Sequence, residues 1–345
     1  MKTLRRIMAD QKLKMGLALA VGIGLLALWL SAVDLRAILS RLAGIDLRWL
    51  SLYALLWLSA AFLRSLRWRI ILSRVATIPP LESFAAFMSC MFINFLVPLR
   101  LGEAVASLAL KRNRGIPFAK SLPTQAMDRL FDLTPIVPAL VMVLLMGGKA
   151  SAPLIGFLVF VAVVFSMLSG LVVLSMARTD LAVSLVRACA RVVPSAIRPR
   201  VESFAVLCIQ GLGELKLGAA TIAGLMGMTF LALAIDAASV QAVFMGLGYV
   251  VAPATMLAGY TLFFLMSALP RPPGQVGSHE VLFLLIFSLL LGVDKNVASA
   301  AVLAGHLTLA LLLTAIGSLS LFALGIRSVS VVRDHLPSAT TTGAS

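Results

Sequence analysis

Charged residues interrupt several apolar stretches of this 345-residue chain, and they are the side chains best suited to chemistry. A charge at the centre of a membrane helix costs about 2.5 to 3.5 kcal/mol on insertion scales, so each one needs a partner or a function. The charges concerned are Arg100, Glu103, Asp128, Arg129, Asp132, Asp236, Arg271 and Glu280. Arginine offers a planar fork of donors that matches phosphate, so the set predicts a site for an anionic group. The alternative is mutual neutralisation, for example of Arg100 by Glu103 and of Arg129 by Asp132.

Two runs broken by proline and glycine carry several of these charges. The first contains Asn94, Pro98, Arg100, Gly102 and Glu103, and the second contains Pro270, Arg271, Pro273, Gly274, Gly277, His279 and Glu280. Proline removes a backbone donor and glycine loosens the backbone, and hydrocarbon cannot satisfy the polar groups that are freed. Both runs are therefore predicted to be hairpin tips that face a cavity. The residues expected to shape the tips are Asn94, Pro98, Gly102, Pro270 and Pro273. The expected ligand-binding residues are the charges other than Asp236, together with Gly274, Gly277, His279 and His306.

The histidines and Asp236 leave more than one interpretation open. No third histidine or cysteine lies near His279 and His306 in the sequence, so no metal site is expected, and no cofactor is expected either. Each histidine either replaces a cation, relays a proton or packs as a neutral polar group. Asp236 is the only charge between residues 217 and 245. It either binds a coupling proton or hydrogen-bonds with Gln241 or a neighbouring helix.

Composition places these residues in a membrane. Hydrophobic residues make up 61% of the chain and charged residues 12%, which excludes an ordinary soluble domain and predicts an all-α, polytopic membrane protein. Six segments are long enough to cross hydrocarbon fully: residues 15–33, 48–71, 121–146, 152–176, 217–245 and 297–325. Between them, residues 83–110 and 255–291 form two pairs of shorter arms, predicted to be re-entrant hairpins.

The net charge of +15 does not indicate nucleic acid, because the basic residues follow the predicted topology. Most of the lysines and arginines lie at the N-terminus, in residues 64–74, 111–120 and 178–216, and in the tail, residues 326–345. This positive-inside pattern predicts a bacterial-type inner membrane protein with both termini in the cytoplasm. Val183, Arg187 and Ala190 have helical spacing, so residues 178–216 are expected to hold an amphipathic helix that packs on the membrane or docks a partner.

The two tips are part of an internal repeat. Glu103 and Glu280 are 177 positions apart, and so are Arg129 and His306. Each half has two crossings, a hairpin and one further crossing, and the hairpins enter from opposite sides. We therefore predict two inverted repeats, residues 1–146 and 152–325, as in secondary transporters whose broken helices meet near the midplane.

At these residues the sequence resembles the transmembrane region of lysylphosphatidylglycerol synthases, also described as flippase-like domain proteins. The matching blocks are Asn94 to Glu103, Asp128-Arg129-Leu130-Phe131-Asp132, which looks like the family's Glu-Arg-x-x-Asp stretch, and Pro273 to Glu280, which looks like its Pro-Gly-Gly-x-Gly-x-x-Glu run. Gln275 replaces a glycine of that pattern, and His279 and His306 stand where arginine is frequent. The second half is thus less cationic, which counts against a doubly anionic ligand there.

The resemblance implies movement of a lipid between leaflets: an aminoacylated phospholipid, a glycosylated polyprenyl phosphate or a hopanoid-type lipid. Membrane lipids are the expected partners, and a separate lipid-modifying enzyme is a possible one. No soluble aminoacyl-transfer domain is recognised, so the protein is not expected to be an enzyme. The alternatives are a secondary transporter of a soluble solute and a non-catalytic membrane partner of a lipid-modifying enzyme. An intramembrane enzyme is less favoured, because no nucleophile, base and metal assemble in the sequence.

Overall fold

The chain folds into helices, seen in a computed structural model that describes residues 2–97, 101–145, 152–191, 198–267, 269 and 271–326. The described part of the chain is 84% helical and contains no strand. The helices of the first half are α1 (Lys2–Ala32), α2 (Leu35–Ala43), α3 (Leu47–Leu72), α4 (Pro80–Leu96), α5 (Gly102–Arg114), α6 (Phe118–Phe131) and α7 (Ile136–Leu145). The second half contains α8 (Ala152–Ala177), α9 (Thr179–Ala190), α10 (Arg198–Leu215), α11 (Ala219–Gly246), α12 (Pro253–Met266), the 3₁₀ turn η1 (Pro273–Gln275), α13 (Ser278–Phe283), the π-helical η2 (Leu284–Leu290), α14 (Lys295–Leu312), the π-helical η3 (Leu313–Gly317) and α15 (Ser318–Ala323).

Four of the described helices are long and apolar enough to cross a membrane. They are α3, residues 158–177 of α8, α11, and the continuous stretch from α14 to α15. A fifth span results if α1 from Gly16 is counted with α2, which is bent by 87° relative to it. These helices correspond to five of the six predicted crossings. The chain is therefore a multi-pass helical membrane protein.

The crossing predicted over residues 121–146 is wrong as a single helix. Helix α6 ends at Phe131 and α7 begins at Ile136, with a turn between them. Pro135 lacks a backbone donor and disfavours helical backbone at the residue before it, which accounts for the break. The break follows Asp132, which is the last charged residue of the predicted crossing.

Local sequence signals set several helix boundaries. The side chain of Asp34 accepts hydrogen bonds from the backbone amides of Arg36 and Ala37 at the start of α2. Asp294 caps α14 in the same way by accepting from the amide of Val297. A carboxylate at this position satisfies amides that have no partner within the helix. Gly115 ends α5 with a positive φ of 67°, which glycine adopts without steric cost.

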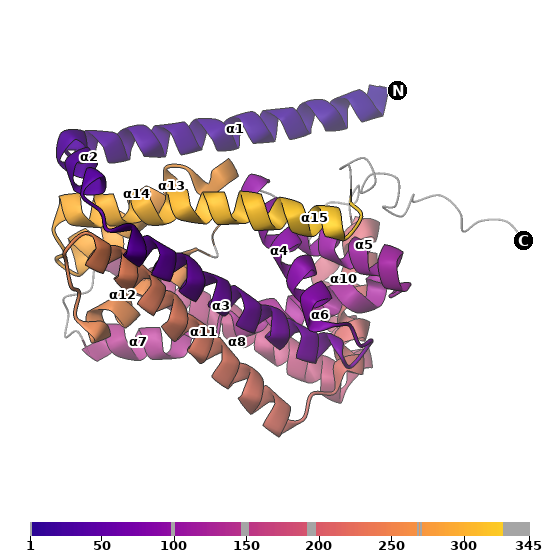
Figure 1. The fold of residues 1–345 in the computed structure, drawn as a ribbon. Helices are drawn as coiled ribbons and strands as arrows, with labels where there is room; N and C mark the ends of the chain where they lie inside the picture. Colours follow the sequence, from indigo (N-terminus) through magenta and orange to yellow (C-terminus); the bar gives the residue numbers. More distant parts are fainter. Residues whose placement is uncertain are drawn as a thin grey trace, which may run out of the picture.

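The helices are arranged around a central pair, α3 and α11, which pack along one another (Figure 1). The hairpin of α4 and α5 lies toward one end of the molecule, and α12 and α13 lie toward the other (Figure 1). These hairpins match the arms predicted within residues 83–110 and 255–291. The start of α1 and the end of α15 lie at the same end of the molecule. Which end faces the cytoplasm, and whether the halves are a true repeat, stay predictions.

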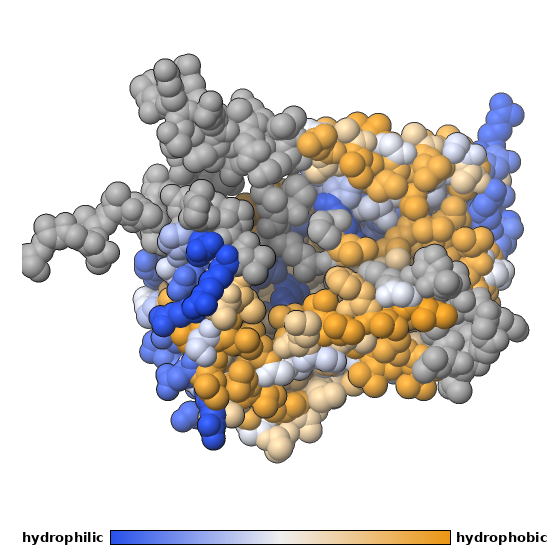
Figure 2. Space-filling view, turned by 180° about the vertical axis from the view of Figure 1, so that it is seen from behind, coloured by the Kyte–Doolittle hydropathy of each residue, from blue (hydrophilic) through white to orange (hydrophobic). Residues whose placement is uncertain are grey.

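The outer surface is suited to hydrocarbon. Large apolar side chains stand exposed on the outside of the helices, for example Val21 on α1, Phe160 on α8 and Leu311 on α14. Figure 2 shows a hydrophobic band between two more hydrophilic edges, and within the band a hollow that contains hydrophilic residues. Hydrocarbon solvates the band, whereas the hollow requires water or a polar ligand.

Residues 178–216 form two helices, α9 and α10, and α9 covers most of the segment whose spacing predicted a helix. Leu181 and Leu185 are exposed on α9, one helical turn apart, and Arg187 shares that helix. Helix α10 packs against α6, α8 and α9. The loop is therefore part of the folded body, and its position on the cytoplasmic surface stays a prediction.

Candidate functional site

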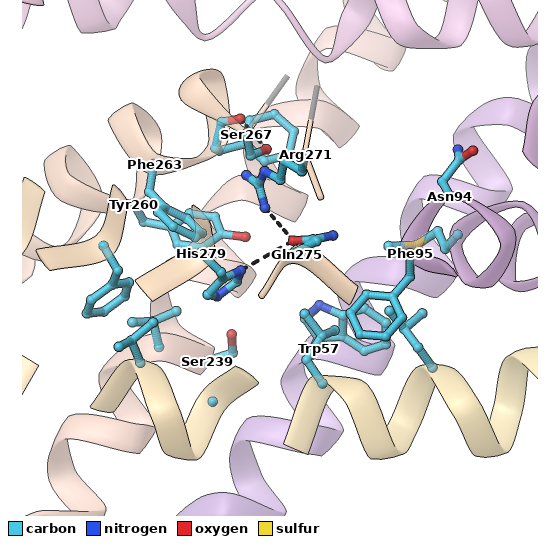
Figure 3. Close-up of a pocket in the computed structure, with 18 of the residues that line it drawn as sticks. Trp57, Asn94, Phe95, Ser239, Tyr260, Phe263, Ser267, Arg271, Gln275 and His279 are labelled. Carbon is cyan, nitrogen blue, oxygen red and sulfur yellow. Dashed lines mark hydrogen bonds between the residues drawn. The ribbon is translucent and has the colours of Figure 1, made fainter. Parts of the chain in front are cut away.

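A cavity of about 260 Å³ lies where the two hairpins converge. Asn94, Phe95 and Glu103 contribute to its wall from the first hairpin, and Arg271, Gln275 and His279 contribute from the second. Figure 3 shows Arg271, Gln275 and His279 close together on one side and Asn94 and Phe95 on the other. Aromatic residues form much of the remaining wall: Tyr53, Trp57, Phe87, Tyr260, Phe263, Phe264 and Phe283.

The first tip is held by Asn94. Its Oδ1 accepts a hydrogen bond of 2.8 Å from the backbone amide of Gly102, and its Nδ2 donates to the two carboxylate oxygens of Glu103 at 3.2 and 3.1 Å. A Cβ atom at Gly102 would lie only 2.1 Å from the carbonyl oxygen of Cys90. The predicted shaping roles of Asn94 and Gly102 thus have a geometric basis. Pro98 and Arg100 lie outside the described residues.

Arg129 connects the first tip to α6. Its Nε donates to Oε1 of Glu103 at 3.1 Å, and its Nη1 donates to Oδ2 of Asp132, also at 3.1 Å. The neutralisation expected between Arg129 and Asp132 is therefore present. The arginine side chain is still 33% exposed, and all three residues line the cavity. Part of this guanidinium remains available to a ligand.

Arg67 was predicted to be one of the basic residues on the cytoplasmic side, in residues 64–74, and this prediction is wrong. It lies within α3 with a side chain only 1% exposed. Its Nε donates to Asp128 at 2.8 Å, and its Nη2 donates to Asp132 at 2.7 Å. The hydroxyl of Thr229 on α11 accepts from its third nitrogen at 2.8 Å. Asp128, predicted to bind the ligand, is instead used inside the fold and does not belong to the cavity wall.

Arg64, also counted among the basic residues of segment 64–74, lies on α3 and forms an ion pair with Asp236 of α11. Of the interpretations left open for Asp236, the contact with a neighbouring helix is the one observed. The expected hydrogen bond with Gln241 is not among the described contacts, and Oε1 of Gln241 is buried there without a partner. Arg64 lines the cavity, so this pair also places a cation at its edge. Proton coupling at Asp236 stays a prediction.

The second tip is organised around the side-chain amide of Gln275. Its Oε1 accepts a short hydrogen bond from Nη1 of Arg271 and lies 3.3 Å from Nδ1 of His279. The Arg271 guanidinium also lies over the ring of Phe263, 5.6 Å from its centroid. Gln275 itself has a φ of 57°, a left-handed conformation that favours glycine, so the glycine of the family pattern has a conformational reason. Pro270 lies outside the described residues, and Pro273 begins the 3₁₀ turn.

Gly277 has a packing role at this tip. Its φ is 76°, and a Cβ atom there would lie 2.3 Å from the carbonyl oxygen of Gly22 on α1. Gly274 likewise has a positive φ, of 65°. Neither glycine lines the cavity, and direct ligand binding by them stays a prediction. They allow the tip to turn and to press against α1.

Glu280 and His306 were also predicted to bind the ligand, and they too lie behind the cavity wall. Nδ1 of His306 is 2.5 Å from Oε1 of Glu280, and its Nε2 is 2.9 Å from the carbonyl oxygen of Gly274. The ring of His306 stacks on that of His279 with a centroid separation of 4.4 Å. Phe95 of the first hairpin meets the His306 ring edge-on at 6.2 Å, so the first hairpin contacts α14 here. No cluster of three metal-ligating side chains occurs among the described residues.

Sequence reasoning missed Arg64, Arg67 and the aromatic wall. A signal for the arginines was available, because residues 64 and 67 are one helical turn apart inside a segment predicted to cross the membrane. The aromatic residues gave no signal, since similar side chains also occur throughout lipid-facing surfaces. Their convergence depends on how α3, α4, α11 and α12 pack.

The wall carries more positive than negative formal charges. Arg64, Arg129 and Arg271 provide three cations, and Glu103 and Asp132 provide two carboxylates. Charged groups enclosed by aromatic side chains interact more strongly than they would in water, because the surroundings screen them less. Asp236 pairs with Arg64 from outside the wall and balances the third cation, so the cavity offers paired arginines to a small anionic group, and Glu103 and Asp132 hold Arg129 in place.

The fold and the cavity define a multi-pass membrane protein with an arginine-containing chamber between two hairpins. Residues 15–317 match the family described as "Lysylphosphatidylglycerol synthase TM region", and the chain belongs to this family. It is also 28% identical over 315 residues to a protein named "Glycosyltransferase AglD" from Haloferax volcanii, an alignment that covers 81% of this chain and 50% of that protein. The chain thus spans about half the length of that relative. No solved structure matches the chain.

Proposed function

We propose that the protein binds the anionic headgroup of a membrane lipid in the cavity and moves that lipid between the leaflets of the plasma membrane. The observation that carries the proposal is the cavity itself, in which Arg129, beside the first tip, and Arg271, at the second, line one chamber. Family membership favours a lipid-related role. The candidate lipids are an aminoacylated phospholipid, a glycosylated polyprenyl phosphate and a hopanoid-type lipid.

The size of the cavity indicates how a lipid would use it. Its volume of 260 Å³ is close to the lower end of the range of about 300 to 1,000 Å³ that is usual for small-molecule pockets. A phosphate-containing headgroup fits such a volume, whereas two acyl chains do not. The chains would stay outside, against the exposed apolar surface of the helices, while the headgroup passes through the protein.

The two hairpins provide candidate gates. In the proposed topology, residues 1–146 and 152–325 are inverted halves with cytoplasmic termini, so each hairpin closes the cavity toward a different leaflet. Alternate movement of the hairpins would expose the headgroup to one side at a time. The sequence carries no ATP-binding motif, so transport is downhill or coupled to an ion.

Translocation of a labelled lipid tests this function. The protein is reconstituted into phosphatidylcholine vesicles that contain a trace of fluorescent phosphatidylglycerol, and the inner-leaflet label is followed by its accessibility to dithionite. We expect Arg271→Gln to slow translocation about tenfold, because a hydrogen bond to a charged group contributes about 1.5 to 3 kcal/mol. Arg187→Gln is the matched control, since its side chain is 60% exposed on α9, away from the cavity. Wild-type rates equal to those of empty vesicles would contradict the proposal.

A second candidate is suggested by the similarity to a protein named as a glycosyltransferase. The chain could serve as the non-catalytic membrane partner of an enzyme that modifies lipids, with the cavity holding a lipid-linked sugar against its aromatic wall. In the same vesicles, an unlabelled glycosylated polyprenyl phosphate would then compete with the fluorescent probe for binding while no lipid is translocated. A soluble-solute transporter would instead show saturable uptake of a water-soluble compound.

A further inference from the structure

Glu280 and His306 form a buried pair that the proposed function does not use. Glu280 lies on α13 in the second hairpin, and His306 lies on α14. The residues are 3% and 7% exposed, and neither belongs to the cavity wall. His279 separates them from the cavity, since it lines the chamber and stacks on His306.

The hydrogen bonds of His306 require a proton between the two side chains. The carbonyl oxygen of Gly274 can only accept, so Nε2 of His306 must donate to it at 2.9 Å. The contact of 2.5 Å between Nδ1 and Oε1 of Glu280 needs one further hydrogen. Either the carboxylic acid donates to a neutral ring, or the imidazolium donates to a carboxylate. In both cases the pair holds one exchangeable proton.

The described surroundings give the Glu280 carboxyl group His306 as its only side-chain hydrogen-bond partner. Oε2 of Glu280 is buried without a hydrogen-bond partner among the described residues, and an ionised carboxylate would leave this oxygen bare. Residues 16–32 of α1, which pack on α13, contain no ionisable side chain. The titratable or charged side chains around the pair come from the second hairpin and from α3, α11 and α12, namely His279, Arg271, Tyr53, Arg64, Asp236 and Tyr260. Helix α2, which also packs on α14, carries Arg36 and Arg41 and lies at one end of the fold (Figure 1).

We propose that Glu280 and His306 form a proton-binding site that holds the second hairpin against α14. We call this pair of contacts, from His306 to Glu280 and to Gly274, the latch. His306 is attached to the hairpin twice, through Glu280 and through the carbonyl of Gly274. Gly274 directly precedes Gln275, whose side chain positions Arg271 and His279 at the cavity. Whether the pair holds its proton therefore affects how firmly Arg271 is positioned at the cavity. This inference rests on the proposed function for its effect on transport, but not for the existence of the site.

Loss of the proton would open the latch. A carboxylate oxygen and the Nδ1 lone pair would then face each other at 2.5 Å and repel. The ring would turn or the hairpin would withdraw, and in either case Gly274 and Arg271 would gain freedom to move. Glu280→Gln removes this step, because the amide NH₂ can donate permanently to Nδ1 while Nε2 still donates to Gly274. The variant therefore imitates the protonated latch.

The site can be tested without transport. The chain has three histidines, so ¹⁵N-histidine NMR of the reconstituted protein gives few signals, and His279→Gln and His306→Gln assign them. From about pH 5 to about pH 10 we expect the Nδ1 signal of His306 to show one titration step in the wild type and none in Glu280→Gln. Glu202→Gln, the same change at a surface ion pair, should retain the step. A wild type without the step, or a Glu280→Gln protein that retains it, would overturn the proposal.

Translocation of fluorescent phosphatidylglycerol then tests the latch. We expect the wild-type rate to rise at least about threefold as pH passes upward through the His306 step, and Glu280→Gln to stay at the low-pH rate throughout. Wild-type translocation that does not respond to pH would reject the latch and leave the proposed function intact. If no translocation occurs at any pH, the proposed function fails, and the NMR result alone decides whether the proton site exists.

Discussion

At the scale of single residues, the cavity depends on arginines that are held by carboxylates. Arg67 is the most deeply buried of them, and it bonds to Asp128, Asp132 and Thr229. The sequence identified the acids as intramembrane charges but not this partner. A basic residue near the end of an apolar segment gives the same sequence pattern in two cases. Its side chain can extend toward the lipid headgroups, or it can point into the protein.

We expect Arg67→Met to lower the free energy of unfolding by about 3 to 5 kcal/mol, because it leaves two buried carboxylates without their cation. The effect should appear as reduced resistance to denaturant in detergent solution. Arg187→Met removes an arginine of an exposed pair and should change stability by less than about 1 kcal/mol. Equal effects of the two substitutions would show that Arg67 does not have the structural role assigned to it.

The sequence and the structure each explain a different feature of Gln275. The family pattern marks its position as one where glycine is usual, and the positive φ explains that preference. What the sequence could not reveal is the function of the side chain that replaced glycine. Gln275 accepts hydrogen bonds from Arg271 and His279. Its side chain thus fixes the position of the Arg271 guanidinium, although its backbone conformation is unfavourable for a residue other than glycine.

At the scale of helices, the hairpins were predictable and the broken crossing was not. Proline and glycine marked both tips, and α4, α5, α12 and α13 lie within or close to the arms expected. The break between α6 and α7 was missed because Asp128, Arg129 and Asp132 were interpreted as functional charges within one continuous span. Helix α2 was not predicted, although the span predicted over residues 15–33 ends where the bend begins.

Close packing of α4 against α5 requires glycine at position 102. We expect Gly102→Ala to destabilise the protein by about 1 to 3 kcal/mol, because the new methyl group would overlap the carbonyl of Cys90. Gly224→Ala on α11 is the matched control, as no atom lies within 4 Å of the added Cβ. That change should be neutral or stabilising by up to about 1 kcal/mol, since alanine favours a helix more than glycine does. Thermal unfolding of the two variants in the same detergent distinguishes a tight helix contact from a general intolerance of alanine.

At the scale of the whole molecule, two hairpins from opposite ends meet at one cavity. The sequence predicted two tips that face a cavity from their prolines and glycines, and an inverted arrangement from the shared spacing of 177 positions. It did not predict which side chains would face the cavity. Asp128, Gly274, Gly277, Glu280 and His306 support the wall from behind, whereas Tyr53, Trp57 and Phe263 form part of it. Such a division depends on the rotation of each helix, which in a uniformly apolar sequence leaves no periodic pattern.

The most direct test of a shared headgroup cavity is to identify which lipids contact the wall residues contributed by each of the two hairpins. A photo-crosslinking phenylalanine analogue is placed at Phe95, at Phe263 or, as a control, at Phe160, which is 63% exposed on α8. After illumination in mixed membranes, mass spectrometry identifies the attached lipids. A shared headgroup cavity should give the same enriched anionic lipid at Phe95 and Phe263, and the bulk lipid composition at Phe160. Bulk composition at all three positions, or different lipids at the two hairpins, would contradict a shared headgroup cavity.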